Sequence, residues 1–133
     1  MHITLESDYA IRIVLYLSQI QKRVEAKNIS ENTEVTLRFA LKILRKLVAA
    51  GIVKSFKGTQ GGYELNKAPA EITLAEVIET VEGTYYLSRC LDPQLGCNRE
   101  NRTSPYCKVQ REFARISDYV RKEMQGITFD KLV

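Results

Sequence analysis

A long basic stretch that ends in a glycine-rich turn limits the folds open to this chain. Residues 35–63 contain no Asp or Glu, and their six basic side chains are Arg38, Lys42, Arg45, Lys46, Lys54 and Lys57. The stretch carries +6 in a chain whose formal net charge is +4, so the remainder sums to −2. Positive charge gathered in one segment indicates a polyanionic partner.

Apolar periodicity divides this stretch into a helix and a hairpin. Thr36 can cap the helix and Gly51 can end it in the left-handed conformation. The positions expected to face inward are Phe39, Ala40, Ile43, Leu44, Leu47 and Val48. Residues 52–57 and 63–65 predict strands around a polar tip at residues 58–62. This order is typical of a winged helix-turn-helix, whose recognition helix enters the major groove of DNA.

The flanking segments predict supporting helices. Ser7 and Asp8 are expected to open a first amphipathic helix, and residues 25–34 suggest a short second one. Residues 73–76 read as a capping box for a scaffold helix that ends before Gly83. Ser104 and Pro105 predict the start of a long last helix. Residues 127–132, with apolar Ile127, Phe129 and Leu132, are expected to cover its end.

The last helix carries an apolar seam with spacings of three and four residues, formed by Tyr106, Val109, Phe113, Ile116 and Val120. Such a seam favours dimerisation through a coiled coil, and the alternative is a helix packed on its own domain. We therefore predict a mainly α protein with a winged helix-turn-helix at 1–66, a scaffold helix and cysteine-bearing loop at 67–103, and a dimerisation helix and tail at 104–133.

Length and composition narrow the function class. A chain of 133 residues with 44% hydrophobic residues fits a single globular domain with an appended element. Neither a signal peptide nor a long apolar run is visible, so we expect a cytoplasmic protein without a membrane partner. Structural disulfides are rare in that compartment, and the three cysteines therefore favour free thiols, a redox switch or metal ligation.

The cysteines Cys90, Cys97 and Cys107 are separated by six and nine residues. This is neither a zinc-ribbon spacing nor the short regular spacing of a ferredoxin. The intervening residues have loop compositions that can bend three thiolates around one centre, and soft thiolates suit an iron-sulfur cluster or zinc. The basic neighbours that can favour thiolates are Arg89, Arg99, Arg102 and Lys108.

The chain resembles the Rrf2-type bacterial transcription regulators, the family of the iron-sulfur regulator IscR and the nitric-oxide-sensing repressor NsrR. The motifs that carry the resemblance are Thr4-x-x-x-Asp8-Tyr9-Ala10-x-Arg12, Leu47-x-x-x-Gly51-Ile52-Val53, Gly58-x-x-Gly61-Gly62-Tyr63-x-Leu65, Thr73-Leu74-x-Glu76-Val77-Ile78 and three cysteines before a long helix. The resemblance implies a homodimer with crossing long helices, two winged modules on a partly palindromic operator, and a cluster near the dimer interface that alters DNA affinity.

The resemblance also implies roles for individual side chains. Thr36, Arg38, Phe39 and Lys42 would approach bases and phosphates, and Lys57 would act as a minor-groove cation in the wing. Arg38 is the expected base reader, because arginine can bond two guanine acceptors at once. The further expected DNA contacts are Lys42, Arg45 and Lys54 on phosphates, with Thr59 and Gln60 at the wing tip. Leu41 replaces an acidic residue of some relatives, so their operator preference does not transfer.

The fourth cluster ligand is open in the sequence. IscR-like members have a histidine three residues after the last cysteine, where this chain has Gln110, and its one histidine is His2. NsrR-like members use an aspartate of the partner subunit, and Asp8 matches that position. Asp8 could instead stabilise the helix terminus and pair with Arg12. The cluster itself could be [4Fe-4S] or [2Fe-2S], or absent in an apo form.

Two functions compete for this chain. The first is a DNA-binding regulator whose cluster senses redox state, nitric oxide or iron-sulfur status. The alternative is a winged-helix regulator without a cluster, controlled by cysteine oxidation or by a partner protein. An enzyme is not expected, because the sequence has no nucleophile-base pair, paired carboxylate motif, phosphate loop or CxxC. A small-molecule substrate is therefore not expected either.

Overall fold

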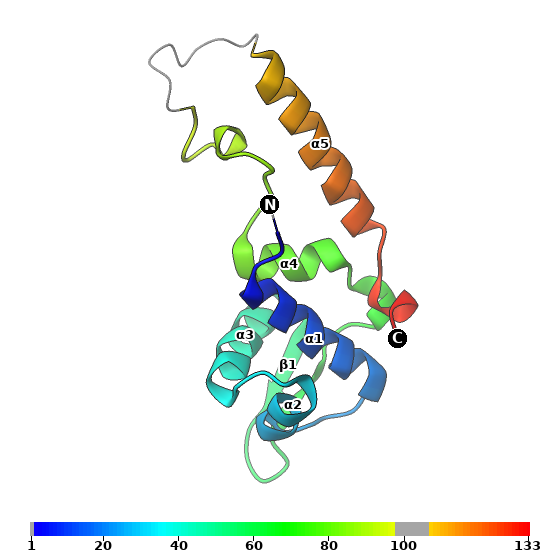
Figure 1. Ribbon diagram of the computed structural model, residues 1–133. Helices are drawn as coiled ribbons and strands as arrows, with labels where there is room; N and C mark the ends of the chain where they lie inside the picture. Colours follow the sequence, from blue (N-terminus) through cyan, green and yellow to red (C-terminus); the bar gives the residue numbers. More distant parts are fainter. Residues whose placement is uncertain (1, 98–106) are drawn as a thin grey trace.

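The computed structural model describes residues 2–97 and 107–133, which form helices and one hairpin (Figure 1). The helices are α1 (Leu5–Ile20), α2 (Ala26–Thr33), α3 (Leu37–Ala49), α4 (Leu74–Glu82) and α5 (Lys108–Gln125). The strands are β1 (Val53–Phe56) and β2 (Gly62–Leu65), and the short 3-10 turns are η1 (Pro69–Glu71), η2 (Arg89–Leu91) and η3 (Phe129–Lys131). This order confirms the predicted mainly α winged helix-turn-helix.

The recognition helix and the hairpin follow the sequence prediction closely. The Thr36 side chain accepts a hydrogen bond from the backbone N–H of Phe39, which caps α3. β1 and β2 pair antiparallel, with Val53 opposite Leu65 and Phe56 opposite Gly62. Helix capping and glycine turns are local signals, and this explains why the sequence locates these elements well.

Other helix termini differ from the prediction. α1 begins at Leu5, because Thr4 caps it by accepting from the backbone N–H of Ser7 at 3.2 Å. The predicted capping box of α4 is only half formed: Thr73 accepts from the N–H of Glu76, while the Glu76 carboxylate lies 2.5 Å from Nζ of Lys67. The predicted start of the last helix at Ser104 and Pro105 lies outside the described residues, as does Tyr106, and α5 begins at Lys108.

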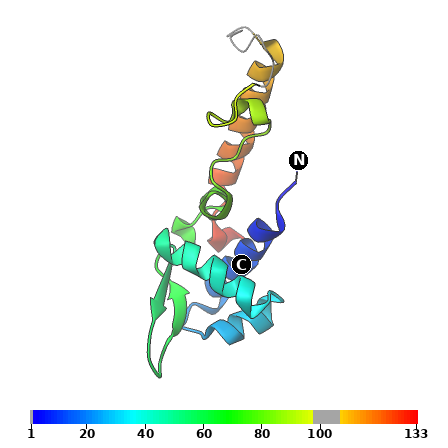
Figure 2. The ribbon, with the colours of Figure 1, turned by 90° about the vertical axis from the view of Figure 1, so that its left-hand side faces the viewer.

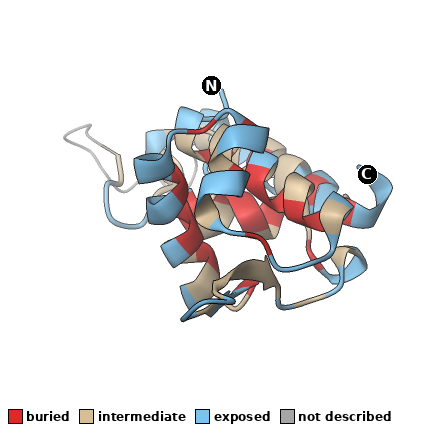
Figure 3. Cartoon of the chain, turned by 90° about the horizontal axis from the view of Figure 1, so that it is seen from below, coloured by how far each residue is buried: buried red, intermediate tan, exposed pale blue. Residues whose placement is uncertain are grey.

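The main core lies where α1, α2, α3, α4 and the hairpin meet (Figure 3). Fully buried side chains there include Ile13, Leu17, Ile29, Ile43, Leu44, Leu47 and Ile52. A second, smaller cluster of Ala75, Ile78 and Met124, with the partly buried Val120 against it, joins α4 to α5. The helix-turn-helix is therefore rigidly packed, and α5 is attached to it through α4.

The C-terminal tail returns to the main core, and Lys131 of the tail also donates to the carbonyl of Gly126 at the end of α5 at 3.4 Å. Thr73 and Thr128 form a β-bridge, and the N–H of Phe129 donates to the carbonyl of Ile72 at 3.1 Å. Phe129 is fully buried. Leu132 is 42% exposed, and its role in covering the helix end stays a prediction.

The hairpin tip and the upper end of α5 lie at opposite ends of the molecule. Figures 1 and 2, two views related by a 90° rotation, both show α5 rising away from the helical body while the hairpin points the other way. In the residues that the structure describes, no helix has the length and apolarity to cross a membrane.

Replacement of Phe129 by Ala should destabilise the protein strongly. The side chain is fully buried, and a Phe-to-Ala change in a core costs about 3–5 kcal/mol through lost burial and a cavity. Urea denaturation measures the loss. Leu132→Ala is the matched control in the same tail, and its free energy of unfolding should stay within about 0.5 kcal/mol of the wild-type value. Equal effects of the two substitutions would contradict the placement of the tail.

Candidate DNA-binding surface and thiol site

The basic face of α3 is exposed and its orientation is fixed. Arg38, Lys42 and Arg45 are all exposed, whereas the opposite face of the helix is buried through Ala40, Ile43, Leu44 and Leu47. Burial of that apolar face prevents rotation of the helix about its axis. The three cations therefore point outward as a constant array, which is the arrangement a recognition helix requires.

Phe39 lies outside the core, contrary to the inward position predicted for it. Its side chain is 43% exposed, and its ring makes an edge-on contact with Tyr9, with the ring centroids 5.9 Å apart. The Arg12 guanidinium lies 5.4 Å from the centroid of the Tyr9 ring. Phe39 therefore contributes an apolar contact at the front of α3, beside α1.

The hairpin presents polar and basic residues at its surface. Lys54, Lys57, Thr59 and Gln60 are exposed. Gly58 has φ of +91°, a conformation that favours glycine and lets the chain turn sharply at the tip.

Arg23, in the loop before α2, is a further basic residue at the hairpin that sequence reasoning missed. Its guanidinium carbon lies 3.3 Å from the centroid of the Phe56 ring, and its Nη1 donates to the carbonyl of Gln60 at 3.0 Å. Arg23 lies outside the acid-free stretch, so charge patterning gave no reason to connect it with the hairpin.

The first turn of α1 links the recognition helix to α4. The Glu6 carboxylate lies 2.7 Å from Nζ of Lys46 and 3.6 Å from Nζ of Lys42, both on α3. Lys46 also donates to the carbonyl of Val81, near the C-terminus of α4, at 3.2 Å. The hydrogen bond from Lys46 lowers the pKa of Glu6 below its ordinary value of 4.5 and outweighs the opposing effect of burial.

A second carboxylate approaches the same turn from α4. The Glu82 carboxylate accepts hydrogen bonds from the hydroxyl groups of Thr4 and Ser7, and Ser7 is fully buried. The N-terminal end of a helix is its positive end, so a carboxylate is favoured there. We call this set of contacts among Thr4, Glu6, Ser7, Lys46 and Glu82 the α1 junction.

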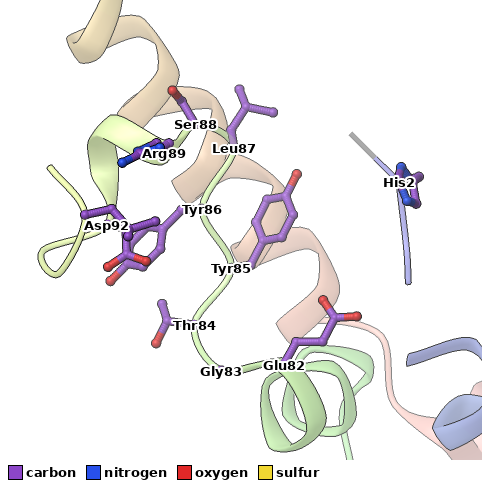
Figure 4. Close-up of a pocket in the computed structure, with 11 residues that line it drawn as sticks. His2, Glu82, Gly83, Thr84, Tyr85, Tyr86, Leu87, Ser88, Arg89 and Asp92 are labelled. Atoms are coloured by element: carbon purple, nitrogen blue, oxygen red, sulfur yellow. The ribbon is translucent and has the colours of Figure 1, made fainter. Parts of the chain in front are cut away.

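The linker that follows Glu82 leads to the thiols and is tied to α5. The Ser117 hydroxyl on α5 accepts from the N–H of Leu87 in the linker at 2.7 Å. Just before the linker, the Glu79 carboxylate of α4 lies 2.8 Å from the Arg121 guanidinium of α5. Figure 4 shows the groove beside this linker, with His2 across from the chain that runs from Glu82 to Ser88.

Gln110 connects two of the three thiol-bearing positions. Its side-chain amide donates to the carbonyl of Cys90 at 3.1 Å, and its backbone N–H donates to Sγ of Cys107 at 3.5 Å. Sγ of Cys90 also lies 3.3 Å from the Ser88 hydroxyl. Cys90, Cys97 and Cys107 are all half-buried and free. Cys90 and Cys107 are therefore both held at the first turn of α5.

The donor chemistry at this end of α5 fits an iron-sulfur cluster, because three free thiols belong to one loop and one helix terminus. Across residues 2–97 and 107–133, however, no group of three or more Cys, His, Asp or Glu side chains is placed to hold a metal ion. Asp8, the predicted fourth ligand, pairs with Arg12 at 2.7 Å. The conformation described here thus keeps Asp8 in its alternative, helix-stabilising pairing.

The predicted dimerisation seam is only partly covered within one chain. Val109 is 61% exposed, Phe113 and Ile116 are half-buried, and Val120 packs in the second cluster against α4. The lower end of α5 therefore packs on its own chain, whereas the end near Val109 keeps apolar side chains at the surface.

Comparison with known proteins places these features in a family. The Rrf2 family, described as an iron-dependent transcriptional regulator, matches residues 3–133. The HTH-type transcriptional regulator NsrR of Shouchella clausii (strain KSM-K16) is 29% identical over 115 residues, which cover 83% of this chain and 73% of that protein.

Solved structures share the fold of this chain. IscR of T. potens has a TM-score of 0.79 at 19% identity, with coverage of 99% of this chain and 85% of that chain. CymR, the global cysteine regulator of B. subtilis, has a TM-score of 0.76 at 24% identity, with coverage of 99% and 95%. These similarities show that the chain shares the winged-helix fold of both proteins.

Glu6→Gln should lower stability at neutral pH but not in acid. The pKa of Glu6 is lowered in the folded protein, so its ion pair stabilises the fold above the ordinary value of 4.5, and this stabilisation is lost as pH falls through the lowered pKa. Urea denaturation of wild type and variant at about pH 7 and about pH 3 measures the difference. Glu31→Gln, an exposed change on α2, is the control. A deficit of equal size at both pH values would refute the ion pair.

Proposed function

Since this chain belongs to the Rrf2 family of transcriptional regulators, we propose that it is a cytoplasmic homodimer that binds operator DNA with an affinity set at its thiol site. Members of this family are transcriptional regulators and not enzymes. In the proposed complex, two copies pair through the exposed end of α5 and present two winged modules to a partly palindromic site.

The proposed DNA contacts come from α3 and the hairpin. The exposed array on α3 supports Arg38 as the base-reading residue and Lys42 and Arg45 as phosphate contacts. The remaining proposed contacts are Thr36 and Phe39 at the front of α3, and Lys54, Lys57, Thr59 and Gln60 in the hairpin. Lys42 lies 3.6 Å from Glu6 in the free protein, so binding of a phosphate would compete with that carboxylate.

For the control site, we propose an iron-sulfur cluster held by Cys90, Cys97 and Cys107, with Asp8 of the partner subunit as a fourth ligand. When bound, such a cluster supplies a centre that oxygen, nitric oxide or iron shortage can damage. The observation that carries this proposal is the Gln110 bridge, which holds two of the three thiol-bearing positions at one helix terminus.

The route from the thiols to the DNA-binding surface is the α1 junction. The cysteine-bearing linker begins directly after Glu82, whose carboxylate is bound by Thr4 and Ser7 of α1. Glu6 lies in the same turn of α1, and its carboxylate contacts Lys46 of α3. A displacement of the linker would move Glu82 and change how α1 supports α3, which provides two states and a physical link between them.

A cluster-free thiol switch is the second candidate, and two observations favour it. In the described part of the chain the three thiols do not form a metal-binding group, and the fold is shared with CymR, the global cysteine regulator of B. subtilis. In this case oxidation of the thiols, or a partner protein bound beside them, would displace the linker.

Protein purified without oxygen should contain iron and acid-labile sulfide in matching amounts and absorb visible light. Cys90→Ser should lose iron and sulfide, since a hydroxyl is a poor replacement for a soft thiolate ligand. Ser88→Ala is the matched control, because Ser88 contacts Cys90 but supplies no thiol. DNA affinity, measured with and without the cluster, should differ.

Colourless wild-type protein, even after reconstitution with iron and sulfide, would eliminate the cluster. The thiol switch would then be tested by DNA affinity before and after mild oxidation, with mass spectrometry of the cysteines. Affinity that responds to neither treatment would overturn control at the thiol site altogether.

A further inference from the structure

The loop between α1 and α2 is fastened to the hairpin by backbone hydrogen bonds. The N–H of Val24 donates to the carbonyl of Tyr63 at 3.0 Å, and the N–H of Tyr63 donates to the carbonyl of Val24 at 2.8 Å. Gly62 allows this approach, because a Cβ there would lie 2.5 Å from the Val24 oxygen. The residue before Val24 is therefore fixed relative to the hairpin.

That residue, Arg23, makes two contacts of different kinds with the hairpin. Its guanidinium stacks 3.3 Å from the centroid of the Phe56 ring and donates to the carbonyl of Gln60 at 3.0 Å. Phe56 pairs with Gly62, so no cross-strand side chain competes for the ring. One contact is to the last residue of β1 and the other is to the tip, so Arg23 holds the end of the strand and the turn that follows it.

Arg23 also changes the charge beside the hairpin. It is exposed, and it lines a shallow groove together with Thr59, Gln60, Glu25 and Glu64. Two carboxylates in that groove would repel DNA phosphates, and the guanidinium offsets one of these two negative charges. A guanidinium has five N–H donors, and only part of this capacity is used by the Gln60 carbonyl.

We propose that Arg23 is a positioning residue for the wing that also presents its own cation to the DNA backbone. This inference rests on wing-mediated DNA binding, which is part of the proposed function. Arginine is required because its planar guanidinium can stack on Phe56 and donate at the same time, whereas a lysine ammonium provides charge without the planar stack. Lys22, the exposed neighbour, supplies a matched cation for comparison.

The test uses the full chain and a DNA duplex that the wild type selects from a random-sequence library. Fluorescence anisotropy at several salt concentrations gives the affinity and its salt slope, and hydroxyl-radical footprinting locates the wing. Arg23→Ala should weaken binding about fivefold and reduce the salt slope by about one. Arg23→Lys should keep the slope but not restore the footprint under the wing. Lys22→Ala should leave that footprint intact.

Phe56→Leu provides a second variant, since it removes the stacking surface while Arg23 keeps its charge. It should lose the wing footprint and retain the salt slope, and thermal melting will confirm that each variant is folded. Restoration of both readouts by Arg23→Lys, or equal behaviour of Arg23→Ala and Lys22→Ala, would overturn the positioning role. A wild-type chain that selects no duplex would instead refute DNA binding itself, which separates the two failures.

Discussion

The hydrogen bonds of Glu82 with Thr4 and Ser7 are the contact on which the organisation of this molecule depends. The first turn of a helix has backbone N–H groups without partners and a positive dipole end. In the first turn of α1, the hydroxyl groups of Thr4 and Ser7 bind the carboxylate of Glu82 from α4. The carboxylate of Glu6, in the same turn, pairs with Lys46 of α3. Lys46 in turn donates to the carbonyl of Val81 at the negative end of α4. Charges of both signs are thus matched to the helix termini that favour them, and three helices meet in one network.

This network lies between the candidate DNA-binding surface and the thiol site. On one side lie the exposed cations of α3 and the hairpin, and on the other lies the terminus of α5 with its thiol-bearing neighbours (Figure 2). The described linker between them begins at the α1 junction and is held to α5 by Ser117 and Gln110. Among the described residues, α4 and α1 join the two ends and contact α3 directly at Lys46, and the C-terminal tail provides a second connection from α5 to the main core at Phe129. Surface ion pairs are individually weak, whereas hydrogen bonds that share partners around the buried Ser7 hydroxyl form a more effective coupling element.

Local signals explain what could be predicted from the sequence. The Thr36 cap, the amphipathic α3 and the glycine-tipped hairpin each depend on residues close in the chain, and each was predicted correctly. The contacts that were missed join distant segments: Arg23 meets Gln60, and Glu82 meets Ser7. Phe39 had the right spacing for a core position, yet the neighbouring α1 offers it only the edge of Tyr9 at the surface, which periodicity alone does not reveal. The thiol site depends on a loop and, in the proposed function, on a second subunit, and neither is encoded in local spacing.

The most direct test of the account is the operator affinity of Glu82→Gln with the thiol site in its two chemical states, after anaerobic purification and after oxidation. The account predicts that wild-type affinity differs between these states by about fivefold or more, the usual lower range for an allosteric coupling. In Glu82→Gln the ratio should fall towards one while the variant remains folded and binds DNA in both states. An unchanged ratio would contradict transmission through the α1 junction, and a wild-type ratio of one would contradict control by the thiols.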